Sequence, residues 1–285
     1  MRSGTPLACA LLVGLAALLS PGGRAEAKPR PSDAPKAVPL PADTMKRLKS
    51  GDMMQVKAAL DDVRTSGRAG APAAPAVAEL LEQGLSPTLT QAAVDTLGDT
   101  EAEAASPALA WYAHHRNVEI RRSAVQALAR TRGPAAVKAL RGSLSDPDAA
   151  VRGFAATGLG SMKAKDAVAD LFVALDHRVA EAAASIGQLC AGNECDRLAG
   201  KLGSVPFDVV TSGLDQVLFR APADVSDDIK VKIVGRVREL GTGEANRFLK
   251  DVQGKWPKTW SARVRQAIDQ AVIATSGSPG AGGAQ

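Results

Sequence analysis

The histidines of this chain, together with one aspartate, are its best candidates for metal binding or acid–base chemistry. His115, Asp146 and His177 follow one another at intervals of 31 residues. If that interval is a structural repeat, the two histidines lie roughly 16–20 Å apart, because neighbouring packed helices are ~8–10 Å apart. Zinc holds its nitrogen ligands at only ~2 Å. We therefore predict no metal site here. No local Ser-His-Asp or Cys-His motif is present either, so we predict no catalytic residue and no cofactor.

Cys190 and Cys195 are predicted to form a disulfide. Cys9 falls in an N-terminal segment that we expect to be removed on export, so an even number of cysteines remains. Exported proteins retain disulfides, whereas cytosolic proteins rarely do. Five residues of straight helix would hold the two cysteines too far apart, since their Cα atoms must come within ~7 Å. A turn at Gly192 can bring them together, and two free buried thiols are the alternative.

Two pairs of residues recur 31 positions apart and are predicted to be structural. Leu128 and Leu159 form one pair, on the apolar stripe of a helix, and Arg121 and Arg152 form the other. Arg265 takes the same position later in the chain. We expect these arginines to pack their aliphatic stems against the fold and to pair with a neighbouring acid. A ligand site is the alternative.

A column of residues off the apolar stripe is the candidate partner-binding surface. In successive units it holds Trp111, Gly142, Val173 and Gly200. A Trp beside glycines and a valine on a polar flank would form a shallow apolar groove, and Tyr112 and Phe172 adjoin it. We predict that Trp111, Tyr112, Gly142 and Val173 bind a partner. The alternative is that Trp111 and Phe172 fill gaps between units, because large aromatic side chains are mostly buried.

These residues are placed by a repeat whose unit is a pair of helices. Residues 118–129 return as residues 149–160 with the same apolar positions. A first helix is predicted over 117–130, a break at Gly133-Pro134, and a second helix reaching about Leu144. A fixed period of this size indicates stacked supersecondary units, and no segment alternates like a strand. The predicted fold is all-α, an α-solenoid of about six antiparallel helix pairs.

The chain is predicted to have four parts: a signal peptide over 1–27, a Pro-rich linker over 28–42, the solenoid over 43–275 and a Gly/Ala tail over 276–285. Met1-Arg2, the apolar run Leu7–Leu19 and Ala25-Glu26-Ala27 are typical of a cleaved secretion signal. An uncleaved anchor is the alternative, although the run is shorter than the ~20 residues of a membrane span. We expect cleavage after Ala27 and an extracytoplasmic location, either periplasmic or secreted.

The charge of the chain does not favour a nucleic acid as its partner. The formal charge is +5, with 35 basic and 30 acidic residues. Cleavage after Ala27 would remove Arg2, Arg24 and Glu26, so the charge would become +5 − 2 + 1 = +4. Nucleic-acid binders concentrate basic residues on one face, whereas here the two signs are interleaved. We expect a protein partner, no nucleic acid and a monomeric chain.

The segment Asp146–Gly160, with the sequence DPDAAVRGFAATGLG, resembles a HEAT repeat. In particular it is similar to the short HEAT-like units named after phycobilisome linker-chromophore lyases. The resemblance extends over about 51–274 and is strongest over 117–202. It implies a superhelix of helix pairs that acts through protein–protein contacts, as a scaffold or adaptor. Two alternatives follow: a lyase-type or other enzyme accessory subunit, and a nucleic-acid-binding solenoid.

Overall fold

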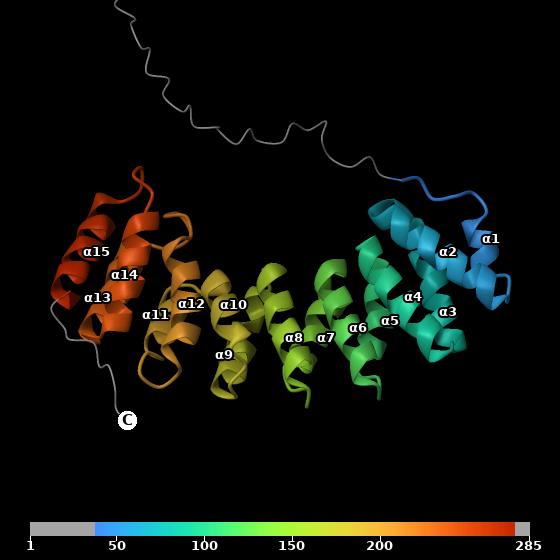
Figure 1. The fold of residues 1–285 in the computed structure, drawn as a ribbon, viewed down its shortest axis with the longest axis horizontal. Coiled ribbons are helices and arrows are strands. Elements are labelled where there is room, and N and C mark those ends of the chain that lie inside the picture. Colours follow the sequence, from blue (N-terminus) through green and yellow to red (C-terminus); the bar gives the residue numbers. More distant parts are fainter. Residues whose placement is uncertain (1–37, 277–285) are drawn as a thin grey trace, which may run out of the picture. The chain divides into compact units, whose positions relative to one another are not determined.

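The structure is a computed structural model that describes residues 38–276. The predicted signal peptide, most of the predicted linker and most of the predicted tail lie outside these residues. In chain order the α-helices are α1 (Thr44–Leu48), α2 (Met53–Ser66), α3 (Ala74–Gln83), α4 (Pro87–Thr100), α5 (Ser106–Tyr112), α6 (Val118–Thr131), α7 (Pro134–Ser143), α8 (Ala149–Ser161), α9 (Val168–Asp176), α10 (Glu181–Leu189), α11 (Asn193–Ala199), α12 (Phe207–Leu218), α13 (Asp227–Glu239), α14 (Gly243–Lys255) and α15 (Ala262–Thr275) (Figure 1). Short 3₁₀ turns are η2 (Gly67–Ala73), η3 (Glu103–Ala105) and η4 (Lys165–Ala167).

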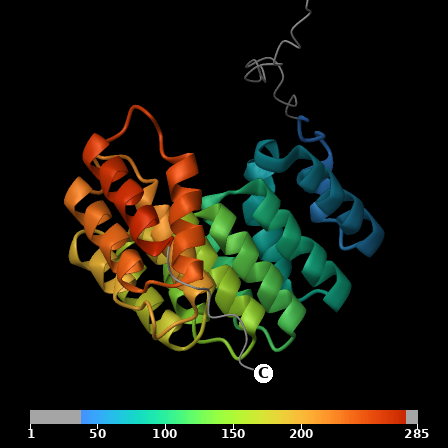
Figure 2. The same cartoon turned by 60° about the vertical axis from the view of Figure 1, so that its left-hand side comes forward.

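The helices of the repeat form two layers. We call α2, α4, α6, α8, α10 and α12 the A-type helices, and α3, α5, α7, α9 and α11 the B-type helices. Each A-type helix packs closely on the next A-type helix, and each B-type helix packs on the A-type helix that follows it. Figure 2 shows the green helices of the middle units side by side in this arrangement. Successive B-type helices contact one another less, and this leaves grooves between them.

Caps and turn residues set the helix boundaries of the central units. Asn117 caps α6 by accepting a hydrogen bond from the backbone N–H of Glu119 at 2.9 Å. Asp148 caps α8 in the same way, from the N–H of Val151 at 3.0 Å. Pro134 is the first residue of α7, where proline loses no helical hydrogen bond. Thus α6 and α7 lie within one residue of the helices predicted from the repeat.

The A-type layer is close-packed because it carries small residues where its helices cross. Gly98 of α4 leaves no room for a Cβ atom, which would lie 2.8 Å from the Cβ of Ala127 on α6. Gly187 of α10 and Gly213 of α12 face one another so closely that a Cβ on either would collide with a backbone carbonyl of the other helix. The predicted core residues Leu128 and Leu159 are fully buried in the same layer. Small residues thus explain why the A-type helices approach one another more closely than the B-type helices do.

The C-terminal region departs from the repeat. The sequence pattern predicts about six pairs, with a longer and irregular last region over residues 205–276. This region contains four helices, α12 to α15. α12 extends the A-type layer, but α13 packs on α11 and α15 rather than repeating the earlier pairing. The 31-residue spacing is lost there, so periodicity alone does not place these helices. Over residues 38–276, no helix is long and apolar enough to cross a membrane.

Candidate functional site

The predicted surface column lies in solvent, at the C-terminal ends of the B-type helices. Trp111 on α5 is 80% exposed and Val173 on α9 is 56% exposed. Gly142 on α7 and Gly200, which follows α11, are exposed as well. The alternative interpretation, in which Trp111 fills a gap between units, is therefore wrong for this residue. Its binding role stays a prediction.

Tyr112 and Phe172, the two aromatic residues beside the column, are less exposed to solvent than Trp111 and Val173. Tyr112 is half-buried: its hydroxyl donates to the backbone oxygen of Leu81 at 2.8 Å, and its ring stacks on His115 at 5.8 Å between centroids. Burial raises the pKa of the Tyr112 hydroxyl. Phe172 is a core residue, 1% exposed, with the guanidinium of Arg197 over its ring at 4.1 Å. Gap-filling is thus the right interpretation for Phe172, and Tyr112 offers a partner only part of its ring.

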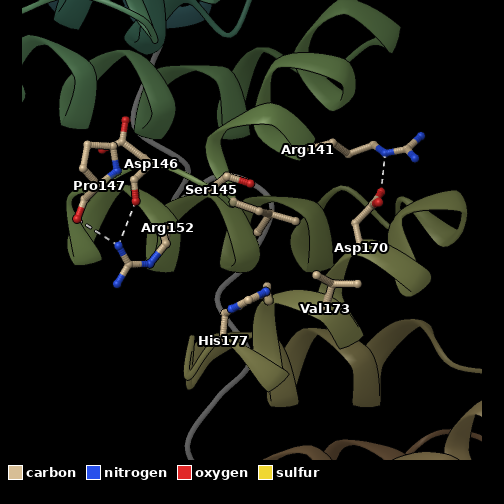
Figure 3. Close-up of a pocket in the computed structure, with 10 residues that line it drawn as sticks. Arg141, Ser145, Asp146, Pro147, Arg152, Asp170, Val173 and His177 are labelled. Atoms are coloured by element: carbon tan, nitrogen blue, oxygen red, sulfur yellow. Dashed lines mark hydrogen bonds and ion pairs between the residues drawn. The ribbon is translucent and has the colours of Figure 1, made fainter.

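A groove of about 480 Å³ lies between α7 and α9 (Figure 3). We call it the α7/α9 groove, and its lining combines an apolar floor with charged walls. The lining residues are Arg141, Leu144, Ser145, Asp146, Pro147, Arg152, Asp170, Val173, Ala174 and His177. On one wall, Arg141 donates to Asp170 at 2.5 Å. Of the four predicted binding residues, Val173 lines this groove. Gly142 lies near the C-terminal end of α7, next to Arg141 in the sequence. Trp111 and Tyr112 lie one unit earlier, on α5.

The repeated arginines tie successive units together through the turns between them. Arg121 donates from Nη1 to the backbone oxygens of His115 and Arg116, at 3.1 and 3.4 Å. Its Nε and Nη2 donate to the two carboxylate oxygens of Asp146, at 2.9 and 3.0 Å. Both side chains of this pair are mostly buried, which strengthens such a two-point contact. The predicted pairing with a neighbouring acid is therefore observed at Arg121, and the acid lies in the turn before the next unit.

Arg152 repeats only half of this arrangement. Its Nη1 donates to the backbone oxygens of Asp146 and Pro147, at 2.7 and 2.9 Å. These are the carbonyls that match the two held by Arg121. The residue that would match Asp146 is His177, which lines the same groove as Arg152 (Figure 3). Over residues 38–276, no carboxylate lies within 4.0 Å of the Arg152 guanidinium, and Arg152 lines the α7/α9 groove.

The other candidates for chemistry are held in structural roles. Cys190 and Cys195 form a disulfide with their Cα atoms 5.2 Å apart, and both side chains are buried. Lys230 is fully buried, and burial lowers the pKa of its amine. Its Nζ donates to the backbone oxygen of Arg220 at 2.5 Å and lies 4.6 Å from the ring centre of Trp260. In the part of the chain that the structure describes, no group of three His, Cys, Asp or Glu residues is placed to hold a metal ion.

Sequence reasoning identified the column but missed the groove. The groove depends on two features that a single repeat unit does not reveal. One is the wider spacing of the B-type helices, which follows from how closely the A-type helices pack. The other is the exchange of Asp146 for His177 at equivalent positions. The sequence shows this exchange directly, but its meaning depends on knowing that the position faces the repeated arginine.

A family model matches part of the chain, and several solved structures resemble it distantly. Residues 74–149 match the family model described as HEAT repeats. Among solved structures, the chain is similar to the CpcE and CpcF complex of phycocyanin lyase from Nostoc sp. PCC7120, with 17% identity, 87% of this chain and 99% of that chain covered, and a TM-score of 0.43. A designed armadillo repeat protein shares 16% identity over 82% of this chain and 98% of its own, with a TM-score of 0.41. Human deoxyhypusine hydroxylase shares 14% identity over 82% of this chain and 97% of its own, with a TM-score of 0.35.

These likenesses are too distant to carry an argument about function. A search of curated proteins finds no significant match in sequence. The family match covers α3 to the start of α8, and the same alternation of A-type and B-type helices continues through α11. The hydrogen bonds that Arg121 of α6 makes to backbone oxygens recur at Arg152 of α8, which lies beyond the matched residues. On these grounds residues 74–149 match HEAT repeats, and the same helix pairing continues beyond them through α11.

Proposed function

We propose that this protein is an exported scaffold or adaptor that binds a partner protein through the C-terminal ends of its B-type helices. The observation that carries the proposal is the exposure of Trp111 and Val173, 80% and 56%, at equivalent positions of the repeat. An exposed tryptophan costs free energy in water, and Trp is over-represented among residues that dominate binding energy. A partner that spans α5 to α9 would cover both side chains and the exposed Gly142 between them.

Two properties of the surface favour a protein partner over a nucleic acid. Many of its cations are neutralised by neighbouring acids, as in the pairs Arg141–Asp170 and Lys201–Asp176. The α7/α9 groove has both an apolar floor and charges of both signs. Protein interfaces combine apolar area with hydrogen-bonding groups in this way, whereas a nucleic-acid site needs a continuous basic face.

The lyase-type or other enzyme accessory role is the alternative that the resemblance invites. A covalent step on a chromophore or other substrate would need a nucleophile, and a thiolate is the strongest that a protein offers at neutral pH. Cys190 and Cys195 are bound to each other in the structure. No observation on the described residues favours this alternative over binding.

Site-specific photocrosslinking tests the proposal. A benzophenone amino acid at Gly142 would project from the column, because a Cβ there meets nothing within 4 Å. The matched control is the same probe at Gly254 on α14, which is also exposed and open. We expect irradiation of producing cells to give one defined adduct from Gly142, absent from Gly254 and lost when Trp111 is replaced by Ala. Equal capture from both positions, or no adduct from either, would contradict the proposal.

A further inference from the structure

We propose that the α7/α9 groove is a carboxylate-binding site for an acidic side chain of a partner peptide, with Arg152 as the group that binds it. This proposal rests on the scaffold function and gives the chemistry of the partner. Its starting point is an asymmetry between two equivalent places in the same chain. At the first, Arg121 is paired with Asp146. At the second, the residue equivalent to Asp146 is His177, which lines the same groove as Arg152.

The first place shows what the second can bind. Arg121 is held by two backbone carbonyls on one side and offers Nε and Nη2 to both oxygens of a carboxylate on the other, at 2.9 and 3.0 Å. Arg152 is held by the two matching carbonyls, at 2.7 and 2.9 Å. The same side chain is thus oriented in the same way before any acid arrives. A pre-oriented guanidinium loses little freedom on binding, and its fork matches a carboxylate at two points.

The groups around Arg152 leave this site available for an external acid. Asp146 is already used by Arg121 and by the backbone N–H of Asp148, which donates to it at 2.8 Å. Asp170 is paired with Arg141. The carboxylate of Glu181 packs against Gly153, next to Arg152, but makes no ion pair with the guanidinium within 4.0 Å. His177, a further nitrogen donor, lines the same groove (Figure 3).

The rest of the groove indicates a peptide rather than a small anion. Val173 is 56% exposed and lines the same groove with Leu144 and Ala174. A small carboxylate ion bound at Arg152 would leave these apolar side chains exposed to water. A peptide segment with an Asp or Glu near an aliphatic residue would use both features, because the charged group fixes its register and the apolar group supplies buried area. The occupant is therefore a segment of a partner protein that carries an acidic and an aliphatic side chain.

Replacing His177 by Asp is the decisive variant, because it restores the acid of the repeat. The new carboxylate would pair with Arg152 as Asp146 pairs with Arg121 and would close the site from within. The matched control is Gln188→Asp, which makes the same charge change at an exposed position on α10 outside the groove. His177→Asn is a second control that keeps the site open without an acid.

The probe is a library of random nine-residue peptides displayed on phage and selected on the full-length protein. We expect enrichment of Asp or Glu with a Leu, Ile or Val within a few residues. Changing that acid to its amide should weaken the selected peptide at least ~10-fold, as expected for the loss of a charged hydrogen-bonded pair. His177→Asp should weaken it by a similar factor, whereas Gln188→Asp and His177→Asn should not. Selected peptides that lack an acid, that bind His177→Asp as well as the parent, or that fail to appear would overturn the proposal.

The same variants separate this proposal from the scaffold function itself. If His177→Asp still yields the Gly142 photoadduct at the parental level, the partner binds without the Arg152 site, and the carboxylate proposal alone fails. If no adduct depends on Trp111, the scaffold proposal fails, whatever the peptides do. If inorganic phosphate or acetate weakens peptide binding only as much as any other salt at the same ionic strength, the effect is general screening. That result would leave the peptide assignment standing. Stoichiometric binding of either ion to Arg152, with no selected peptide, would contradict it.

Discussion

At the scale of single residues, the repeated arginine has different partners in two successive units. Arg121 and Arg152 hold equivalent carbonyls, but only Arg121 also holds a carboxylate. The sequence was sufficient to predict that Arg121 is structural and that Leu128 and Leu159 are core. It was not sufficient to show what each arginine faces, because the facing residue lies 25 positions later, as Asp146 or His177. The cysteine pair was predictable because it is local, with one turn between the two residues.

The helix cap at Asp148 gives a prediction about acid stability. Two hydrogen bonds from Arg122 and one from the N–H of Val151 lower the pKa of the Asp148 carboxyl from 3.8 to about 2, with the Arg122 contact the largest cause. Since the pKa is lower in the folded state, this contribution to stability is complete above about pH 4 and is lost as the pH falls toward 2. Asp148→Asn can still cap the helix but does not titrate.

Thermal unfolding of the parent and of Asp148→Asn at several pH values checks this prediction. We expect the parent to melt higher at pH 6 and the difference in Tm to shrink as the pH falls from about 4 to 2. Val173→Thr, an exposed change without a titrating group, should show the same difference from the parent at both ends of the range. A Tm difference for Asp148→Asn that is independent of pH would refute the assignment.

At the scale of the elements, the close packing of the A-type helices leaves grooves between the B-type helices. The predicted helix 117–130 is observed as Val118–Thr131, and the predicted break at Gly133-Pro134 is where α7 begins. These boundaries were predictable because caps and turn residues act locally. The crossing of α10 and α12 was not, because it depends on Gly187 and Gly213, which are 26 positions apart. Their meeting is visible only once the units are stacked.

A side chain at Gly213 should therefore disrupt the A-type layer. The Cβ of Gly213→Val would collide with the carbonyl oxygen of Ala183 on α10, and backbone atoms cannot move aside as a flexible side chain can. We expect a loss of roughly 1–3 kcal/mol in the free energy of unfolding, as for overpacked cores. Chemical denaturation followed by circular dichroism measures it.

The control for this substitution is Gly235→Ala on α13. A Cβ at Gly235 meets nothing within 4 Å. Because alanine favours the helix by up to about 1 kcal/mol over glycine, this variant should be as stable as the parent or more so. If Gly213→Val were as stable as Gly235→Ala, the close approach of α10 and α12 would be wrong.

At the scale of the whole molecule, a stack of repeats couples each unit to its neighbours. The fold class was predictable from the 31-residue period, since a fixed period indicates stacked units. The C-terminal helices α13 to α15 were not individually predictable, because the period ends before them. The location of the protein outside the cytoplasm is a proposal that rests on residues 1–27 of the sequence.

A charge placed in the core of one unit should affect more than that unit. Leu128 on α6 is fully buried, so Leu128→Asp would bury a carboxylate without a partner at a cost of several kcal/mol. Repeat stability depends on nearest neighbours. Hydrogen exchange should therefore lose protection in α4 and α8 as well as in α6. Loss confined to α6, or an unchanged melting curve, would count against the stacking described for these helices.

The proposed export makes a direct prediction about mass. The exported chain should begin at Lys28, which follows the small-residue site at Ala25-Glu26-Ala27. Intact-mass spectrometry of the protein from the extracytoplasmic fraction measures this. A product that keeps residues ahead of Ser20, or protein found only in the cytoplasm, would show that the segment is not a cleaved signal.

The most direct test of the scaffold account is the affinity of the crosslinked partner for the parent protein and for Trp111→Ala, with melting curves measured on both. Trp111 is 80% exposed and should contribute little to folding, so the Tm should be nearly unchanged. If it is an interface hot spot, its loss should cost about 2 kcal/mol or more of binding free energy, about a 30-fold increase in Kd. The opposite result, a lowered Tm with unchanged affinity per folded molecule, would contradict the account.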